Sequence, residues 1–319
     1  PKFEWKKRYA YKRGKICYIP SERNLVSAIN NWFEVKFKDN NIRNFMIEWS
    51  DARKSYNKEQ PLSVLDLSTK YYYDDKVERD LVTMESGATL ELTDTSSGLQ
   101  SVIPLEVVSE YLTAYIYKEG RDANLSVTNK GINKSLEDKI YYELFIDHPL
   151  NLLTPTSYLK GGETLRLFKT SSDIDKYEQL LRQFLNVHYT RLYIEEAEQN
   201  IFPATQRAIV YHLLQLMNSK EEHSLFLTTH SPYVLYALNN CIMAHLVKDT
   251  MPMEEQQKLK CYNSRISPQL VSVYEIQEGT LKPIQTQNGT IGKHYFNRIT
   301  NEIMDEYYNM LEYWGDNKE

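Results

Sequence analysis

Two short apolar runs in the second half of the chain each end in polar residues. The first, Leu192–Ile194, is followed at once by Glu195 and Glu196, and the second, Leu225–Leu227, is followed by two threonines and His230. The pattern predicts a strand, a helix and a second strand. Two strands joined in this way are parallel neighbours, so both polar ends are expected at the edge where open α/β sheets bind ligands.

The remaining apolar pattern predicts a protein of the α/β class. Strands are predicted at residues 15–19, 70–73, 79–84, 88–92, 271–276 and about 280–284, and helices at residues 21–35 (capped by Ser21), 42–56, 93–116, 177–187, from 232 onward and 295–311. We expect a mostly parallel sheet flanked by helices on both faces, an antiparallel β lobe, and a helical lid over residues 21–56. Residues 120–172 are rich in Asn, Gly and Pro and predict a loop-rich insertion.

Composition places few limits on this picture. An apolar content of 41% and a charged content of 25% are ordinary for a globular protein, and the net charge of −5 gives no overall attraction to nucleic acid or anionic membrane. Cys17, Cys241 and Cys261 share no metal-ligand spacing and predict reduced thiols in a cytoplasmic protein. No run approaches the roughly 20 apolar residues that span a bilayer, so no membrane partner is expected. The sequence begins with Pro1, from which we expect a further segment upstream.

The adjacent carboxylates suit phosphoryl transfer, which needs one group for a metal ion and one for a water molecule. An isolated Glu-Glu pair is usually solvated surface, but here it follows an apolar strand. The segment I-E-E-A-E-Q-N-I-F-P, Ile194–Pro203, resembles the Walker B and D-loop segment I-E-E-P-E-x-x-L-H-P of ABC-type ATPase heads, the superfamily of SMC, RecF and OLD-family ATPases. The resemblance implies that Glu195 holds Mg²⁺ through water and that Glu196 is the general base. Ala197 and Phe202 depart from the motif without removing a catalytic group.

His230 stands in the context L-T-T-H-S-P. A lone histidine after a strand is more often structural, yet this context resembles the switch histidine that contacts the γ-phosphate in the same superfamily. An imidazole can hydrogen-bond a phosphate oxygen and respond to its loss after hydrolysis.

The segment S-S-G-L-Q, residues 96–100, opens the long predicted helix and resembles the signature motif of this superfamily. The resemblance implies that the Ser97 hydroxyl meets the γ-phosphate and that Gly98 and Gln100 belong to the nucleotide site. A helix N-terminus is also an anion site on physical grounds, although an ordinary helix cap has the same composition. Because the signature of one head meets the nucleotide of another, the resemblance implies an ATP-sandwiched homodimer.

The Walker A pattern G-x-x-x-x-G-K-[S/T] does not occur in the sequence. Two explanations stay open: the chain is the C-terminal part of a longer ATPase whose Walker A segment lies upstream, which we favour, or it is a degenerate head. Arg23 is interpreted as a surface arginine, with a phosphate role as the weaker alternative. Asp173 and Asp175 predict helix capping rather than a nuclease metal site, and the basic, aromatic N-terminus predicts a hairpin rather than a nucleic-acid site.

The sequence as a whole predicts one ATPase head. Its parts are a lid and hairpin, a signature motif with its helix, the insertion, and the Walker B core, at residues 21–92, 93–118, 120–172 and 173–319. The expected activity is Mg²⁺-dependent ATP hydrolysis coupled to DNA handling or to control of an effector in phage defence, with DNA and an effector protein as candidate partners. The alternative is a non-hydrolysing scaffold that binds a toxin or nuclease.

Overall fold

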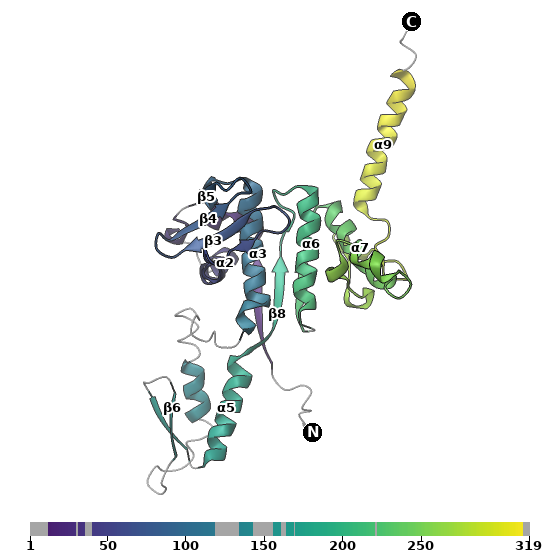
Figure 1. Cartoon of the computed structure of the whole chain (residues 1–319). Coiled ribbons are helices and arrows are strands. Elements are labelled where there is room, and N and C mark those ends of the chain that lie inside the picture. The colour runs from purple at the N-terminus through teal and green to yellow at the C-terminus, as the bar shows by residue number, and fades with distance from the viewer. Residues whose placement is uncertain are drawn as a thin grey trace.

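The computed structural model describes residues 12–29, 31–35, 40–118, 134–142, 156–160, 164–168, 170–220 and 222–314. Within them the fold is α/β, with a parallel sheet and a separate antiparallel sheet (Figure 1). The parallel sheet has the order β1-β8-β9 and consists of β1 (Arg13–Ile19), β8 (Val187–Ile194) and β9 (Ser224–Leu227). The antiparallel sheet has the order β2-β3-β4-β5 and consists of β2 (Leu62–Ser63), β3 (Lys70–Asp74), β4 (Arg79–Thr83) and β5 (Thr89–Glu91).

The register of the parallel sheet brings the ends of its three strands together. Ile19 pairs with Ile194, and Ile194 pairs with Leu227, so all three strands finish side by side. The polar residues that follow β8 and β9 therefore share one sheet edge, as the apolar pattern predicts. The segment after β1 reaches the same edge.

The two faces of the parallel sheet differ. Side chains alternate along each strand, so Leu192 and Ile194 face the core while Tyr193 between them is 36% exposed. On the outer face Tyr193 stacks against Phe226 of β9, which is 59% exposed, with ring centroids 5.8 Å apart. Ile16 of β1 is also exposed. The prediction of helices on both faces therefore does not hold within the described residues, where this face of the sheet is open.

Two helices cover the buried face of the sheet. They are α3 (Ser97–Thr113) and α6 (Pro203–Asn218), which contact each other and enter the same apolar core as the strands. In Figure 1 they flank β8. α3 is buried along most of its length because α2 (Asn41–Ala52) packs against it as well. This central position explains why its apolar positions are not confined to one stripe.

The predicted lid helix over residues 21–35 is wrong as a single element. The chain forms η2 (Ser21–Asn24), α1 (Leu25–Ala28) and η3 (Trp32–Glu34), and the backbone becomes extended at Ile29. Val26 and Trp32 are both buried, yet residues six apart lie about 120° apart around a continuous α-helix and so point to different sides of it. A break lets both reach the core. Ser21 is not the cap, because Pro20 occupies that position and no side chain bonds there.

The second predicted helix and the hairpin lobe are confirmed. α2 begins after Asn40, whose side chain accepts a hydrogen bond from the Arg43 backbone N–H, and it continues into η4 (Arg53–Ser55). The turn between β4 and β5 contains Gly87 at φ +84°, a conformation that glycine adopts without steric cost. The prediction that a turn at residues 85–87 joins two antiparallel strands therefore holds.

The helix before β8 is longer than predicted. α5 (Ser171–Leu185) starts at Ser171 because Thr170 caps it and accepts a hydrogen bond from the Asp173 backbone N–H at 3.2 Å. The Asp173 carboxylate in turn accepts from the Thr170 hydroxyl. Thr170 is therefore the cap in place of Asp173, which lies inside the first turn of α5 and bonds back to the cap residue. In the predicted insertion the structure describes a helix at 134–142 and the hairpin β6 (Thr156–Lys160) and β7 (Thr164–Phe168).

The C-terminal part follows the predicted order. After α7 (Pro232–Leu246) come α8 (Met253–Gln257), the hairpin β10 (Tyr274–Gln277) and β11 (Thr280–Pro283), and α9 (Tyr295–Trp314). Short 3₁₀ turns occur at Leu92–Asp94, Tyr115–Tyr117, Tyr262–Ser264 and Pro268–Leu270. In Figure 1 α9 projects away from the rest of the chain. No helix among the described residues is long and apolar enough to cross a bilayer. The basic N-terminal residues 1–11 lie outside the described residues.

Candidate functional site

The two predicted catalytic carboxylates lie directly after β8, and hydrogen bonds to both neighbouring strands fix their backbone. The Glu195 N–H donates to the carbonyl of Ile19 at 3.0 Å, and the Glu196 N–H donates to the carbonyl of Thr228 at 3.1 Å. The ladder of the sheet therefore continues one residue beyond the strands on each side. Both side chains are half-buried to exposed at the sheet edge.

Glu196 has an unusual backbone conformation. Its φ is +43°, in the left-handed region, where a side chain costs roughly 1–2 kcal/mol. Such strain persists only where the surroundings over-determine it, and it gathers at functional sites. The hydrogen bond to Thr228 supplies one constraint, and a buried arginine supplies another.

Arg23 is that arginine, and its interpretation as a surface residue is wrong. It is 1% exposed. Its guanidinium donates to the carbonyl of Glu195 at 2.9 Å, to that of Glu196 at 2.8 Å and, through Nε, to that of Ser101 in α3 at 3.2 Å. Burial lowers the pKa of Arg23 to about 10, against the opposing effect of the carboxylates of Glu198 and Glu196. Arg23 stays charged at neutral pH. Its hydrogen bonds fix the backbone of the loop after β8 that carries Glu195 and Glu196, which we call the carboxylate loop.

His230 lies beside Glu196, at the sheet edge that the apolar pattern predicts for both residues. Its Nε2 atom is 3.7 Å from Glu196 Oε1, and the side chains of the two residues are 84% and 39% exposed. The backbone N–H of His230 donates to the carboxylate of Glu198, so that residue links the loop after β8 to the loop after β9. The imidazole therefore reaches solvent while its backbone is fixed.

The loop that carries His230 is also anchored to α6. The Ser231 hydroxyl contacts the side-chain oxygen of Gln206 and accepts a hydrogen bond from the Tyr233 N–H, which makes Ser231 the cap of α7 as predicted. The side-chain amide of Gln206 donates to the carbonyl of Ile201. One glutamine thus connects the segment after Glu196 with the segment after His230.

Glu195 has an environment that can accommodate a cation. Its carboxylate accepts a long hydrogen bond of 3.4 Å from the Ser21 N–H and contacts the Tyr18 hydroxyl. Burial, together with that contact to Glu195, raises the pKa of Tyr18 to about 12. A carboxylate has roughly four acceptor positions and is a hard oxygen ligand of the kind Mg²⁺ takes, so the residues present fit the predicted role of Glu195.

The signature-like segment forms the N-terminus of α3. Ser96 caps the helix by accepting from the Leu99 N–H, and Ser97 is exposed at its first turn. Gly98 lies against the loop after Glu196, because an added Cβ would stand 3.1 Å from the Asn200 carbonyl. Glycine therefore permits a close approach between this turn and that loop.

Gln100 has a definite role inside the chain. Its side-chain amide nitrogen donates to the carbonyls of Leu92, Thr93 and Thr95, which fixes the turn before α3. Its assignment to the nucleotide site stays a prediction. No hydrogen bond or ion pair between described residues joins Ser97 to Glu195, Glu196 or His230, so its predicted role toward a nucleotide on a second head also stays a prediction.

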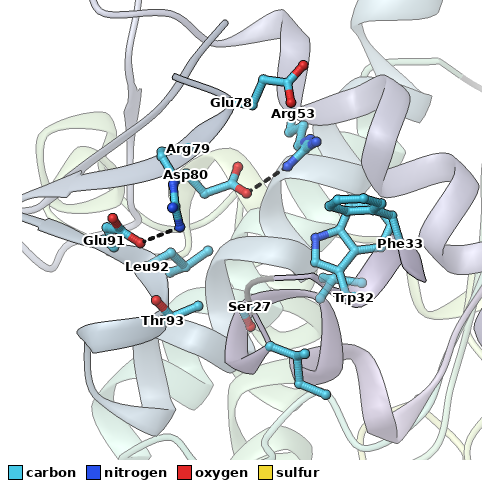
Figure 2. Close-up of a pocket in the computed structure, with 12 residues that line it drawn as sticks. Ser27, Trp32, Phe33, Arg53, Glu78, Arg79, Asp80, Glu91, Leu92 and Thr93 are labelled. Carbon is cyan, nitrogen blue, oxygen red and sulfur yellow. Dashed lines mark hydrogen bonds and ion pairs between the residues drawn. The ribbon is translucent and has the colours of Figure 1, made fainter. Parts of the chain in front are cut away.

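A separate hollow lies between the lid and the antiparallel sheet (Figure 2). Four of its charged side chains form two ion pairs: Arg53 bonds Asp80 at 2.9 Å, and Arg79 bonds Glu91 at 3.0 Å. Trp32 forms part of the wall, and the Arg53 guanidinium lies 5.3 Å from its ring centroid. None of the predicted site residues lines this hollow, which we interpret as part of the packing of the lid.

The chain matches no model of a protein family, and no curated protein is similar to it.

Sequence reasoning missed the residues that support the site. The sequence pattern places Arg23 at the surface, predicts no role for Tyr18, and gives Glu198 only a place in the motif. The sequence does hold a signal for Arg23 and Tyr18, because the same apolar pattern predicts a strand that ends at residue 19. When that strand pairs with β8, its C-terminal end lies beside Glu195 and Glu196.

Proposed function

We propose that the chain is the Walker B part of an ATPase head of the ABC type, which hydrolyses ATP with Mg²⁺ in an ATP-sandwiched homodimer. The observation that carries the proposal is the placement of Glu196 and His230. They follow neighbouring parallel strands, their side chains lie 3.7 Å apart, and both reach solvent. The resemblance of the segments around residues 96–100, 194–203 and 230 to this superfamily supports the same proposal.

Each residue has a distinct part in the proposed reaction. Bound Mg²⁺, held through water by Glu195, would neutralise charge on the phosphates. Glu196 accepts the proton of the attacking water through a carboxylate that is 39% exposed and lies 3.7 Å from His230. His230 donates a hydrogen bond to the γ-phosphate. Arg23 acts as a positioning residue, because it touches only the backbone of the loop.

The output of such a head is movement between open and closed dimers. We propose that this movement serves DNA handling or the control of an effector protein in phage defence. The alternative is a non-hydrolysing scaffold that binds a toxin or nuclease partner. A parent protein without a Walker A segment would support the alternative, since the backbone of that loop normally holds the phosphates. The strained conformation of Glu196 favours hydrolysis.

The test is ATP turnover of the full-length protein beside its Glu196→Gln variant. We expect turnover in the wild type and a loss of about 10²–10⁴-fold in the variant, the range for removal of a general base. The variant should also accumulate as an ATP-bound dimer by light scattering, because it binds ATP without consuming it. Glu85→Gln, in the turn between β4 and β5, is the matched control and should leave turnover unchanged.

Two results would separate the candidates. ATP-dependent dimerisation with no turnover in the wild type would support the scaffold. Equal ATP turnover in the wild type and in Glu196→Gln would contradict the assignment of Glu196 as the general base.

A further inference from the structure

A second group of ionisable side chains lies inside the fold, away from the sheet edge. Glu106 and Glu110 occupy neighbouring turns on one side of α3, and His212 faces them from α6. A carboxylate oxygen from each glutamate and a ring nitrogen of His212 lie within 4.8 Å of one another. The closest measured pair, His212 Nε2 and Glu110 Oε1, is 3.5 Å apart.

The polar atoms of this cluster are only half satisfied. Glu106 is 1% exposed, and its Oε1 atom accepts from the Leu65 N–H at 3.2 Å, but its Oε2 atom is buried without a hydrogen-bond partner among the described residues. Within the same part of the chain His212 Nε2 is also buried without a hydrogen-bond partner. An unpartnered buried carboxylate oxygen is costly, so this arrangement calls for a proton or a cation between the groups.

The hydrogen bonds that do exist orient the cluster. Leu65 N–H holds one oxygen of Glu106, and the Tyr56 hydroxyl donates to Glu110 Oε2 at 2.5 Å. Each carboxylate thus has one oxygen fixed by a neighbouring donor, while Glu110 Oε1 faces His212. Metal ligands in proteins are held in this way by outer hydrogen bonds.

We propose that Glu106, Glu110 and His212 bind one Zn²⁺ ion, which joins α3 to α6. Two carboxylates and one neutral imidazole balance a divalent charge and form an N/O ligand set that Zn²⁺ accepts. In a tetrahedral zinc site with bonds of about 2.0–2.2 Å, ligand atoms stand roughly 3.3–3.5 Å apart, and the His212–Glu110 pair already has this spacing. The third ligand atom, a carboxylate oxygen of Glu106, lies within 4.8 Å of the other two.

The site has a route for the ion and a structural consequence. The side chains of His212 and Glu110 are 18% and 23% exposed, so an ion can enter past them toward the buried Glu106. α3 starts at the signature-like turn, and α6 follows the carboxylate loop. The ion would fix the two helices that lead to the candidate ATPase site, without taking part in its chemistry.

The test is a zinc titration of the nucleotide-free full-length protein against a competing chromophoric chelator, with metal content measured by mass spectrometry. We expect one Zn²⁺ per chain in the wild type and a loss of affinity greater than 100-fold in Glu106→Gln and in His212→Gln, since even outer residues cost about 10–100-fold. Tyr56→Phe removes such an outer donor and should weaken binding by about 10-fold. His245→Gln, a histidine of α7 outside the cluster, is the matched control.

Thermal stability gives a second readout of zinc binding. Zinc should raise the melting temperature of the wild type and the control but not that of the two ligand variants, which also reports whether those variants fold. Should Glu106→Gln fail to fold, His212→Gln gives the same test at a partly exposed position. No uptake by the wild type, or equal uptake by wild type and ligand variants, would overturn the site and leave a cluster that shares a proton. Glu195→Gln should keep the zinc, so failure of the proposed ATPase and failure of the zinc site are distinguishable.

Discussion

The protein holds two pairs of glutamates that are fixed in opposite ways. Glu195 and Glu196 have their backbone fixed by strands and by Arg23, and their side chains lie at an open sheet edge. Glu106 and Glu110 stand on a regular helix, and their side chains are held by neighbouring donors inside the fold. An open pair on a rigid backbone suits a ligand that binds and leaves. An enclosed pair on fixed side chains suits one that stays.

Removal of the Arg23 side chain should have the largest effect on stability. Arg23→Met removes the guanidinium that donates to the carbonyls of Glu195, Glu196 and Ser101, of which only that of Glu196 is shown with a further donor, the Gln199 N–H, and a buried group that loses its partner costs about 1–3 kcal/mol. We expect a loss of about 4 kcal/mol in the free energy of unfolding, measured by urea denaturation. Arg43→Met, at an exposed position of α2, should change it by less than about 0.5 kcal/mol.

A small effect of Arg23→Met would contradict the view that the carboxylate loop depends on this buried side chain. Arg23→Lys sharpens the test, because lysine keeps the charge but loses the planar fork that reaches separate carbonyls. It should recover only part of the lost stability. Full recovery would show that the charge matters and the geometry does not.

The sequence predicts the open pair and misses the enclosed one for a physical reason. Glu195 and Glu196 follow an apolar strand, and register places His230 beside them, so a local pattern carries the information. Glu106 and His212 meet only through the packing of two helices, which no local pattern specifies. One signal was available, since Glu106 is a single charge in the apolar run V-I-P-L-E-V-V.

The same distinction explains the lid. The apolar spacing of residues 21–35 resembles that of a helix, but Val26 and Trp32 must both enter the core, and the helix breaks at Ile29 to allow it. Arg23 was assigned to the surface because arginine is rarely buried without partners. Its partners are backbone carbonyls contributed by segments distant in sequence, and those become visible only in the folded chain.

His223, a buried histidine directly before β9, provides a reference for the enclosed cluster. His223 is fully bonded: its Nδ1 atom accepts from the Thr190 N–H at 3.0 Å, and Nε2 lies 3.2 Å from the Thr113 carbonyl. His223→Ala should cost about 1–3 kcal/mol at pH 7.5, because it leaves both backbone groups unpaired. The free energy of unfolding by urea at several pH values is the measurement.

The contribution of His223 to the free energy of unfolding should fall as the pH falls. Burial lowers the pKa of His223, and a neutral ring is needed to accept from Thr190. The unfolded chain therefore binds a proton more readily, and the contribution of His223 to stability is present above its unfolded pKa of about 6.5 and is lost as the pH falls below it. The difference between wild type and His223→Ala should shrink from pH 7.5 toward pH 5.5. A difference that stays constant would contradict a neutral ring, and the exposed His230→Ala should show no difference at either pH.

The smallest expected effect lies at Glu196 itself and has the opposite sign. Glycine adopts a positive φ without the roughly 1–2 kcal/mol cost that a side chain carries, although its greater freedom in the unfolded chain returns part of the gain. Glu196→Gly should therefore raise the free energy of unfolding by about 0.5–1 kcal/mol while removing ATP turnover. Glu278→Gly is the matched control, because Glu278 has a φ of +49° in the turn between β10 and β11. It should give the same stabilisation and keep the turnover. If Glu196→Gly is instead less stable than the wild type, the contact between the Glu196 side chain and His230 outweighs the backbone strain. Side-chain contacts would then fix the open pair, as they fix the enclosed pair.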